Sequence, residues 1–382
     1  MSRERSKQPT ESLDVTVSGG SMGGLFTGLA LRSAGHDVTV HEQSTGRLRS
    51  RGAGIVAQRN VRRFLGRHAA AAPEEITTAS SERRYLTRDG DVERSAAESM
   101  AFTSWDAVYR RLRAAFPDDR YRTGEEVVAA DSETATARLA DGTELSADLV
   151  VVAEGGQSST RRDLFSDVDP EFAEYVAWRG VVSESDLSAA VVDAFDDRFV
   201  FYQGSNHLIL AYFIPGDDGG TAPGTRRLNW VWYDSLERRD RTAVFTDAGG
   251  TERTVTVPPG RLRESVLDRQ LDRAESELPP VFTTLVTETT DPFVQAIYDL
   301  TVPRMTVGRV CLLGDAAFVA RPHTAAGTAK AAGDAVELRR ELDRRETLGS
   351  ALSAWDDART EYGNRLVERG RRMGRERLGL GE

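Results

Sequence analysis

Two glycine-containing turns, one near each end of the chain, constrain its fold most strongly. The first turn covers residues 19–24 and follows a short run of β-branched residues at 15–17. The second begins at Gly314-Asp315 and follows the apolar run at 310–313. Each pattern is typical of a buried strand that ends in a tight turn before a helix. We therefore expect strands from both ends of the chain to share one α/β domain.

The chain is long enough to hold more than one domain. Its 382 residues can bury a substantial core, as two or three domains or as one large domain with an inserted subdomain. The formal net charge of −10 does not indicate a basic stripe or domain, so nucleic acid is not expected as a partner. We expect small molecules, or the protein itself, as partners.

The N-terminal residues and the single cysteine limit the expected cellular location and the kinds of site that the chain can form. Residues 1–12 are polar and charged without an apolar core, so they predict a flexible tail rather than a signal peptide. No apolar run reaches the roughly 18 residues that a membrane span needs, and a cytoplasmic protein is expected. Because Cys311 has no second cysteine, a disulfide within the chain and a paired-cysteine metal site are excluded. No metal site is predicted.

The N-terminal part of the chain begins with a strand-helix-strand unit. Its predicted elements are a strand at 14–18, a helix at 25–33 and a strand at 38–40. The two strands should pair in parallel with a right-handed crossover. Further along, a buried strand at 148–153 leads into the turn Glu154-Gly155.

The middle of the chain changes to β-rich segments. Between about residues 175 and 290, short apolar segments alternate with glycine and proline clusters. The predicted strands lie at 177–182, 198–202, 207–214 and 228–233. This pattern is typical of a mostly antiparallel sheet inserted into the α/β domain. The chain then ends in helices predicted at 328–344 and 347–372.

The first glycine turn predicts a dinucleotide site. Gly19 and Gly24 match the first and third glycines of the dinucleotide fingerprint, and Ser21 stands at the second. The first glycine permits the tight turn, and the third lets helix and strand pack closely. Glu42 ends the second strand about twenty residues further on, where an acid accepts hydrogen bonds from ribose hydroxyls. A carboxylate there favours FAD or NAD over NADP.

The second glycine turn favours FAD over NAD. Asp315 ends a distant strand, and Pro322 precedes a helix whose N-terminus begins near Gly327. A simple NAD dehydrogenase does not need this second half. In an FAD site, Asp315 can bind the ribityl chain. The amides near Gly327, with the helix dipole, can stabilise negative charge on the reduced flavin.

These observations define the predicted fold class and its boundaries. The fold class is α/β, with a Rossmann-like FAD-binding domain, an inserted and mostly antiparallel substrate sheet, and C-terminal helices. The predicted units are a flexible tail at 1–12, the first part of the FAD-binding domain at 13–174 with short substrate-domain segments near 75–100, the β-rich substrate domain at 175–290, the second part of the FAD-binding domain at 291–346 and the C-terminal helix at 347–382.

Several motifs occur in the order found in a known family. They are the glycine turn with Glu42, the segment Arg51-Gly52-Ala53-Gly54-Ile55, the turn Glu154-Gly155, and Gly314-Asp315 through Asp334-Ala335. With them the chain resembles, over about residues 14–362, the single-component FAD-dependent aromatic hydroxylases, which include p-hydroxybenzoate and salicylate hydroxylases. The resemblance implies a cofactor site made of Gly19, Ser21, Gly24, Glu42, Arg51, Glu154, Gly155, Asp315, Pro322 and Gly327.

A second set of segments is more specific, because several of its members lie in the predicted substrate sheet. They are residues 102–106, 175–181, 207–209, 214–216 and 321–327. These segments resemble the hydroxypyridine-hydroxylating members of the family. Within them, Arg321-Pro322-His323 departs from the broader family and points to this subgroup.

Several positions depart from the usual pattern of the family, and three of them bear on function. Glu154 stands where the family usually has Asp, Phe318 where it often has His, and Trp105 where it often has an Arg that contacts the flavin nucleotide. These departures motivate one alternative, a flavin-binding protein without hydroxylase activity. A second alternative is an FAD-dependent oxidoreductase that does not insert oxygen.

The resemblance implies a monooxygenase reaction. NADH or NADPH reduces FAD, O₂ gives a C4a-hydroperoxyflavin, and its distal oxygen is transferred to an electron-rich carbon of an aromatic or N-heteroaromatic ring. A hydroxypyridine-like substrate is favoured. A homodimer is plausible by the same analogy.

The Trp230-Val231-Trp232 run raises the alternative of a flavin-dependent halogenase. Strand alternation, however, places both indoles on one sheet face, where packing in the core or at an interface is the stronger interpretation.

A base near the flavin would speed oxygen transfer by deprotonating the substrate hydroxyl. His323 follows Pro322 at the predicted flavin-facing turn and is the first candidate, with capping of the next helix as the alternative. His207 opens a strand of the substrate sheet and is the second candidate. The other histidines are expected at the surface; they are His36, His41 and His68. Arg179, Tyr202 and Tyr212 are weaker candidates for substrate contacts, against simple packing in the sheet.

Overall fold

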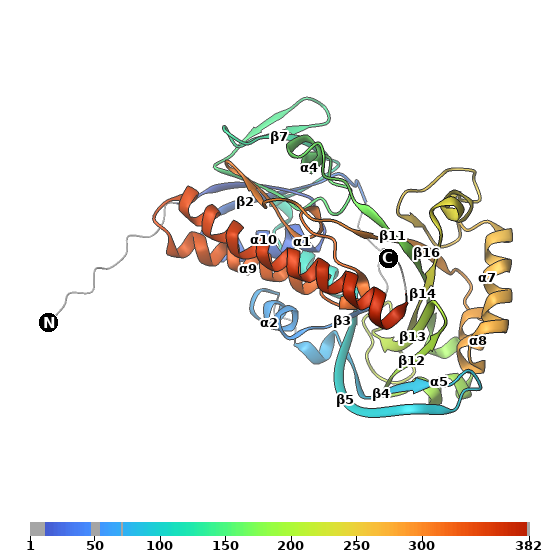
Figure 1. Cartoon of the computed structure of the whole chain (residues 1–382). Helices are drawn as coiled ribbons and strands as arrows, with labels where there is room; N and C mark the ends of the chain where they lie inside the picture. The colour runs from blue at the N-terminus through green and yellow to red at the C-terminus, as the bar shows by residue number, and fades with distance from the viewer. Residues whose placement is uncertain (1–11, 47–53, 70–71, 380–382) are drawn as a thin grey trace.

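The computed structural model describes residues 12–46, 54–69 and 72–379. Within these residues the chain forms two large sheets joined by a layer of helices, together with a small third sheet (Figure 1). Arg51 and almost all of the predicted N-terminal tail lie outside the described residues.

The first large sheet has six strands and is parallel except at one edge. In spatial order its strands are β17 (Thr306–Val307), β18 (Val310–Leu312), β10 (Leu149–Val152), β1 (Asp14–Ser18), β2 (Asp37–Glu42) and β6 (Tyr121–Thr123). Every residue of β10 and β18 is buried, as expected for parallel strands covered on both faces. The strand order reverses between β1 and β10, which is where open α/β sheets bind ligands.

Helices cover this sheet and fill the space toward the second one. They are α1 (Met22–Arg32), α2 (Arg59–His68), α3 (Trp105–Ala115), α4 (Ser159–Leu164), α9 (Gly327–Arg344) and α10 (Leu348–Met373). Helix α1 packs against α9, and α9 packs against α10, so segments from both ends of the chain share one hydrophobic core (Figure 1). Trp355 is fully buried in that core, and its indole Nε1 donates to the carbonyl of Asp334 at 3.0 Å.

The second large sheet has nine strands and is mostly antiparallel. In spatial order its strands are β15 (Thr256–Val257), β16 (Phe293–Asp299), β11 (Glu171–Ser183), β14 (Arg227–Ser235), β13 (His207–Ile214), β12 (Arg198–Gly204), β4 (Thr78–Leu86), β5 (Val92–Ser104) and β3 (Gly54–Val56). Its one parallel pair joins β12 and β4. The small third sheet consists of β7 (Val127–Asp131), β8 (Thr136–Leu139) and β9 (Glu144–Ser146).

The two faces of the nine-stranded sheet have different neighbours. One face packs under α5 (Ala189–Phe195), α7 (Glu264–Glu277) and α8 (Pro280–Thr287), as Figure 1 shows for α7 and α8 at the outer side. We call this the helix-covered face. The other face carries a separate cluster of buried aromatic side chains. We call it the aromatic face, and it is defined by Phe102, Tyr175, Phe199, Phe201, Tyr212 and Tyr233.

The predicted fold class is confirmed, with two differences in detail. Helix α1 begins at Met22, three residues before the predicted start at 25, because the glycine turn passes directly into the helix. The nine-stranded sheet also contains the long β4–β5 hairpin at residues 78–104, where only short segments near 75–100 were predicted. Trp230 and Trp232 are buried on the helix-covered face, which confirms the packing interpretation. In the part of the chain that the structure describes, no helix is long and apolar enough to cross a membrane.

Candidate functional site

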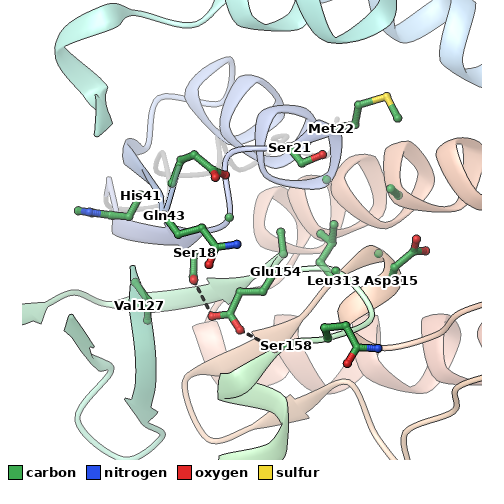
Figure 2. Close-up of a pocket in the computed structure, with 18 of the residues that line it drawn as sticks. Ser18, Ser21, Met22, His41, Gln43, Val127, Glu154, Ser158, Leu313 and Asp315 are labelled. Atoms are coloured by element: carbon green, nitrogen blue, oxygen red, sulfur yellow. Dashed lines mark hydrogen bonds between the residues drawn. The ribbon is translucent and has the colours of Figure 1, made fainter. Parts of the chain in front are cut away.

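A cleft of about 700 Å³ opens at the carboxyl ends of β1, β2, β10 and β18 (Figure 2). Residues from both glycine turns line it, including Gly19, Ser21 and Asp315. The N-termini of α1 and α9 also reach its wall. Segments at opposite ends of the sequence therefore meet in one cleft at the point where the strand order reverses.

The first glycine turn has the conformation that a nucleotide-binding turn needs. Gly19 has φ +100°, and a Cβ there would lie 2.5 Å from the carbonyl oxygen of Ala153. Its amide donates to the carbonyl of His41 at 2.8 Å. At Gly24, a Cβ would lie 1.9 Å from the Gly19 carbonyl oxygen. Both positions therefore require glycine, one for the turn and the other for close helix packing.

Glu42 lies at the end of β2 and faces the cleft. Its side chain is buried, and its two carboxylate oxygens accept hydrogen bonds from the amides of Gly20 at 2.8 Å and Ser44 at 2.9 Å. Because each carboxylate oxygen can accept more than one hydrogen bond, Glu42 can hold the glycine turn and still accept from ribose hydroxyls.

The two helices that point at the cleft offer uncapped amides. Ser21 precedes α1 and Ala326 precedes α9, and neither side chain caps its helix. The first turn of each helix also lacks an acidic residue. Gly327 and Thr328 line the cleft at the start of α9. Two helix N-termini with free donors and positive dipole ends suit the negative groups of a dinucleotide.

Glu154 connects the two sides of the cleft. Its carboxylate accepts hydrogen bonds from the hydroxyls of Ser18 and Ser158 at 2.6 Å each, shown in Figure 2, and from the hydroxyl of Thr160 at 2.7 Å. The amide of Thr160 also donates, at 3.2 Å. Glu154 thus joins the end of β1 to the start of α4, and the adjacent Gly155 lines the cleft with φ +81°.

The residues around the cleft fit FAD. The glycine turn would permit close approach of a pyrophosphate, and Glu42 lines the cleft at the end of β2, where it could accept hydrogen bonds from a ribose. Asp315 lies on the other side of the cleft (Figure 2). The volume also suits a molecule of this size, since ligand pockets commonly measure about 300–1,000 Å³. Residues contributed by β1, β2, β10 and β18 would hold the cofactor across the strand reversal.

His323 does not line this cleft; it lies between the nine-stranded sheet and α10. It belongs to the short helical turn Pro322–Thr324. Its Nε2 lies 3.0 Å from the Gly370 carbonyl of α10, so this nitrogen must carry the proton and donate. The other nitrogen, Nδ1, then accepts from the hydroxyl of Tyr175 at 3.3 Å. Burial lowers the pKa of His323 to about 4, so the ring is neutral at pH 7.

His207 lies on the helix-covered face, away from the cleft. It is buried, and its Nδ1 accepts from the indole of Trp232 at 3.0 Å. Its Nε2 lies 3.5 Å from Glu277 of α7. Burial lowers the pKa of His207. The structure therefore does not bring this second candidate base to the aromatic face.

The surface expectation for two of the remaining histidines was wrong. His36 and His41 are both buried. His36 accepts from the amide of Leu13 at 3.2 Å through Nδ1. His41 lines the cleft, and its Nδ1 lies 2.6 Å from Glu125. The sequence could have predicted that His41 is buried, because it is the penultimate residue of β2, a strand that ends at the cofactor cleft.

The unusual Phe318 and Trp105 have different surroundings. Phe318 is buried against α10, where a Cβ at Gly363 would lie 2.3 Å from its ring. Trp105 lines the cleft and stacks on Tyr109, with ring centroids 4.8 Å apart. Phe318 therefore belongs to the helical core, whereas Trp105 places an aromatic surface where a cofactor could contact it.

Of the polar residues on the aromatic face, Arg179 and Tyr212 were named as weaker candidates from the sequence, whereas Tyr175 and Tyr233 were not singled out. Tyr175 and Tyr233 lie there beside His323, with ring centroids 6.3 and 6.0 Å from the imidazole. Arg321 is buried and pairs with Asp299 of β16, its Nη2 at 2.9 Å. Counting alternate residues from Tyr175 would have placed Ala177 and Arg179 on this face with it.

The cleft and the adjoining sheet define a flavoprotein of the FAD-binding class. The FAD binding domain-like family matches residues 172–299. The 2,6-dihydroxypyridine 3-monooxygenase of Paenarthrobacter nicotinovorans is 35% identical over 363 residues, which cover 94% of this chain and 90% of that relative. The chain therefore belongs to the family of FAD-dependent aromatic hydroxylases, and the expected resemblance to its hydroxypyridine-hydroxylating subgroup is confirmed.

Solved structures agree with this assignment. The structure of 2,6-dihydroxypyridine-3-hydroxylase from Arthrobacter nicotinovorans is 34% identical and matches with a TM-score of 0.91, covering 98% of this chain and 95% of that one. HpxO from Klebsiella pneumoniae, solved in complex with FAD and uric acid, shares the fold with a TM-score of 0.76 at 20% identity, covering 94% and 87%.

Proposed function

We propose that this protein uses FAD, NADH or NADPH, and O₂ to hydroxylate an N-heteroaromatic ring of the hydroxypyridine type. One observation carries the proposal. The segment that begins with Asp315 in the cofactor cleft ends at His323 on the aromatic face, so one short stretch of chain touches both places. The similarity to a 2,6-dihydroxypyridine 3-monooxygenase supports the same substrate class.

The aromatic face would receive the substrate ring. Tyr212 and Tyr233 are buried there, and burial raises the pKa of both phenols. They therefore stay protonated at neutral pH and can donate hydrogen bonds to ring oxygens. Two buried donors beside aromatic rings suit a flat, oxygen-bearing ring.

Arg179 and Asn229 add two further donors to this face. Arg179 has no carboxylate partner among the residues that the structure describes, and its buried Nε has no hydrogen-bond partner there. Asn229 is fully buried; its side-chain oxygen accepts from the Gly54 amide at 2.8 Å, while its Nδ2 has no partner in the same residues. Unpaired buried donors are costly. We infer that a deprotonated ring hydroxyl would satisfy them.

His323 would act in this reaction as a positioning residue. Its neutral ring accepts from Tyr175 and donates to α10, which holds the Tyr175 phenol in one orientation beside Tyr233. With its pKa lowered to about 4, His323 is a weak base at neutral pH. Deprotonation of the substrate would then depend more on stabilisation of the anion by Arg179 than on proton removal by His323.

FAD, once bound and reduced by the nicotinamide dinucleotide, would supply the activated oxygen. The chain would hold the cofactor through the glycine turn, Glu42 and the start of α9. It would keep water from the reacting ring by covering it between the cofactor and the aromatic face. The hydroxyl is expected to enter an electron-rich ring carbon that lies next to, or opposite, a carbon bearing an oxygen.

A substrate panel tests this proposal. The FAD-loaded protein is mixed with NADH or NADPH and with hydroxypyridines, hydroxynicotinates or hydroxybenzoates, and oxygen uptake is recorded with product analysis. We expect dihydroxypyridines to stimulate oxygen uptake most and to yield a hydroxylated product. A protein that binds FAD but gives no hydroxylated product from any of these rings would contradict the proposal.

A further inference from the structure

Lys330 is a buried cation behind the cofactor cleft. It lies in the first turn of α9, and its side chain is 1% exposed. Its Nζ forms no hydrogen bond with the described residues. The nearby carboxylate is that of Asp315, whose Oδ1 lies 3.4 Å from Nζ. Asp315 itself is 53% exposed and lines the cleft.

This arrangement is energetically expensive for a residue with no function. A buried ammonium group loses its hydration, and one ion-pair contact does not replace three hydrogen bonds. An apolar residue of similar length would pack at this position without that cost. The neighbours of Lys330 in α9 are small apolar residues, Ala329 and Ala331 among them. An apolar side chain would therefore suit this helix, and the presence of a lysine calls for another reason.

The Lys330–Asp315 ion pair lies beside the N-terminus of α9, which points at the cleft. The start of α9 directs free amides and a positive dipole end at the cleft. Asp315, next to the same helix end, brings a negative charge that would oppose this dipole. Because Lys330 contacts Asp315 from the buried side, the pair has no net charge, and the carboxylate keeps its acceptor oxygens for the cleft.

We propose that Lys330 is a positioning residue of the FAD site that holds Asp315 in place and cancels its charge, so that the positive end of α9 acts undiminished on the reduced, negatively charged cofactor. The inference rests on the FAD site and on the role proposed for Asp315. It does not depend on which ring is hydroxylated. Its consequence is a higher midpoint potential of the bound flavin than the cleft would give without the lysine.

Four variants test the role of the charge. Lys330→Met removes it at nearly constant length, and Lys330→Arg keeps it. Asp315→Asn removes the opposing charge, and the double variant Lys330→Met/Asp315→Asn removes both. Arg340→Met is the matched control, because Arg340 lies on the same helix but is exposed and pairs with Glu337.

The readouts are the midpoint potential of bound FAD, from a spectroscopic redox titration, and the dissociation constant of FAD. We expect Lys330→Met to disfavour the reduced form about tenfold, which lowers a two-electron potential by about 30 mV, and to weaken FAD binding. Lys330→Arg should lose less. The double variant should regain the wild-type potential, and Arg340→Met should not change it.

An unchanged potential in Lys330→Met, with FAD bound, would overturn the inference. If Lys330→Met binds FAD too weakly to titrate, the double variant decides: recovered binding supports the inference and continued failure refutes it. A wild-type protein that binds FAD but hydroxylates no ring would refute the proposed function alone, since the potentials can still be compared.

Discussion

The Nδ1 of His323 lies 3.3 Å from the hydroxyl of Tyr175, and this contact joins the turn after β18 to the aromatic face of the nine-stranded sheet. The same imidazole donates to Gly370 of α10. Arg321, two residues earlier, pairs with Asp299 of the same sheet. The Arg-Pro-His run therefore anchors the end of the cofactor segment to the sheet that would receive the substrate.

The first prediction concerns the pH dependence of stability. His323 has a pKa of about 4 in the folded protein and about 6.5 when unfolded. Between these values the unfolded chain binds the proton and the folded chain does not, so stability is lost as pH falls through this window. The full effect is at most about 3 kcal/mol. His323→Gln should show a smaller loss in urea unfolding between pH 7 and pH 4.5.

The other histidines with lowered pKa values provide an internal control, because His36, His68 and His207 remain in both proteins. Their contribution cancels in the comparison. Equal pH dependence in wild type and His323→Gln would show that the imidazole is not held neutral as described.

The second prediction uses two adjacent glycines of the first turn. A Cβ at Gly24 would lie 1.9 Å from the Gly19 carbonyl oxygen, whereas at Gly23 it would meet only side-chain carbons at 3.5 Å. Gly24→Ala should therefore destabilise the FAD-free protein by about 3 kcal/mol or more. Gly23→Ala should leave it unchanged or slightly more stable, since Ala favours helix. Thermal unfolding without FAD measures both, and similar behaviour of the two variants would contradict the packing described.

The third prediction concerns Glu154. Its removal leaves the donors of Ser18, Ser158 and Thr160 without their acceptor. Glu154→Ala should therefore cost roughly 3 kcal/mol in the free energy of unfolding, and it should weaken FAD binding by loosening the cleft. Glu126→Ala is the control, because Glu126 also lines the cleft but is exposed; its effect should stay within about 0.5 kcal/mol. Equal stability of both variants would mean that Glu154 does not connect β1 to α4.

The fourth prediction concerns Arg179. If its guanidinium binds a ring oxyanion, Arg179→Met should lower kcat/KM for dihydroxypyridines by about 10- to 100-fold, the worth of one charge-assisted hydrogen bond. FAD affinity should not change. Arg179→Lys should recover part of the loss. Steady-state oxygen uptake across a series of rings with different hydroxyl pKa values provides the measurement. A loss that is equal for ionised and neutral rings would exclude anion binding.

The sequence allowed the segments that line the cleft to be grouped. The turn at Gly19, the acid at Glu42 and the distant Asp315 meet in one cleft, because each follows a strand whose burial is visible in its composition. Parallel strands of one sheet bring their carboxyl ends to the same edge. These residues could therefore be grouped without coordinates.

The substrate side was harder to predict, for physical reasons. All eight residues of β13 are buried, so the hydrophobic pattern could not show that His207 and Tyr212 lie on opposite faces. The β5 strand is largely exposed until Phe102, so the sequence predicted only short substrate-domain segments there and not the full strand. Lys330 stands out in the sequence as a single lysine within an alanine-rich helix start. Whether it is a buried charge or a surface residue could be decided only from the structure.

Isotope incorporation tests the central claim most directly. The FAD-loaded protein, NADH or NADPH, and 2,6-dihydroxypyridine are incubated under ¹⁸O₂, and the product is analysed by mass spectrometry alongside the consumption of the nicotinamide. The account predicts a hydroxylated ring that carries one ¹⁸O atom, formed in proportion to the nicotinamide oxidised. Nicotinamide oxidation that yields only hydrogen peroxide, with no ¹⁸O in the ring, would contradict it.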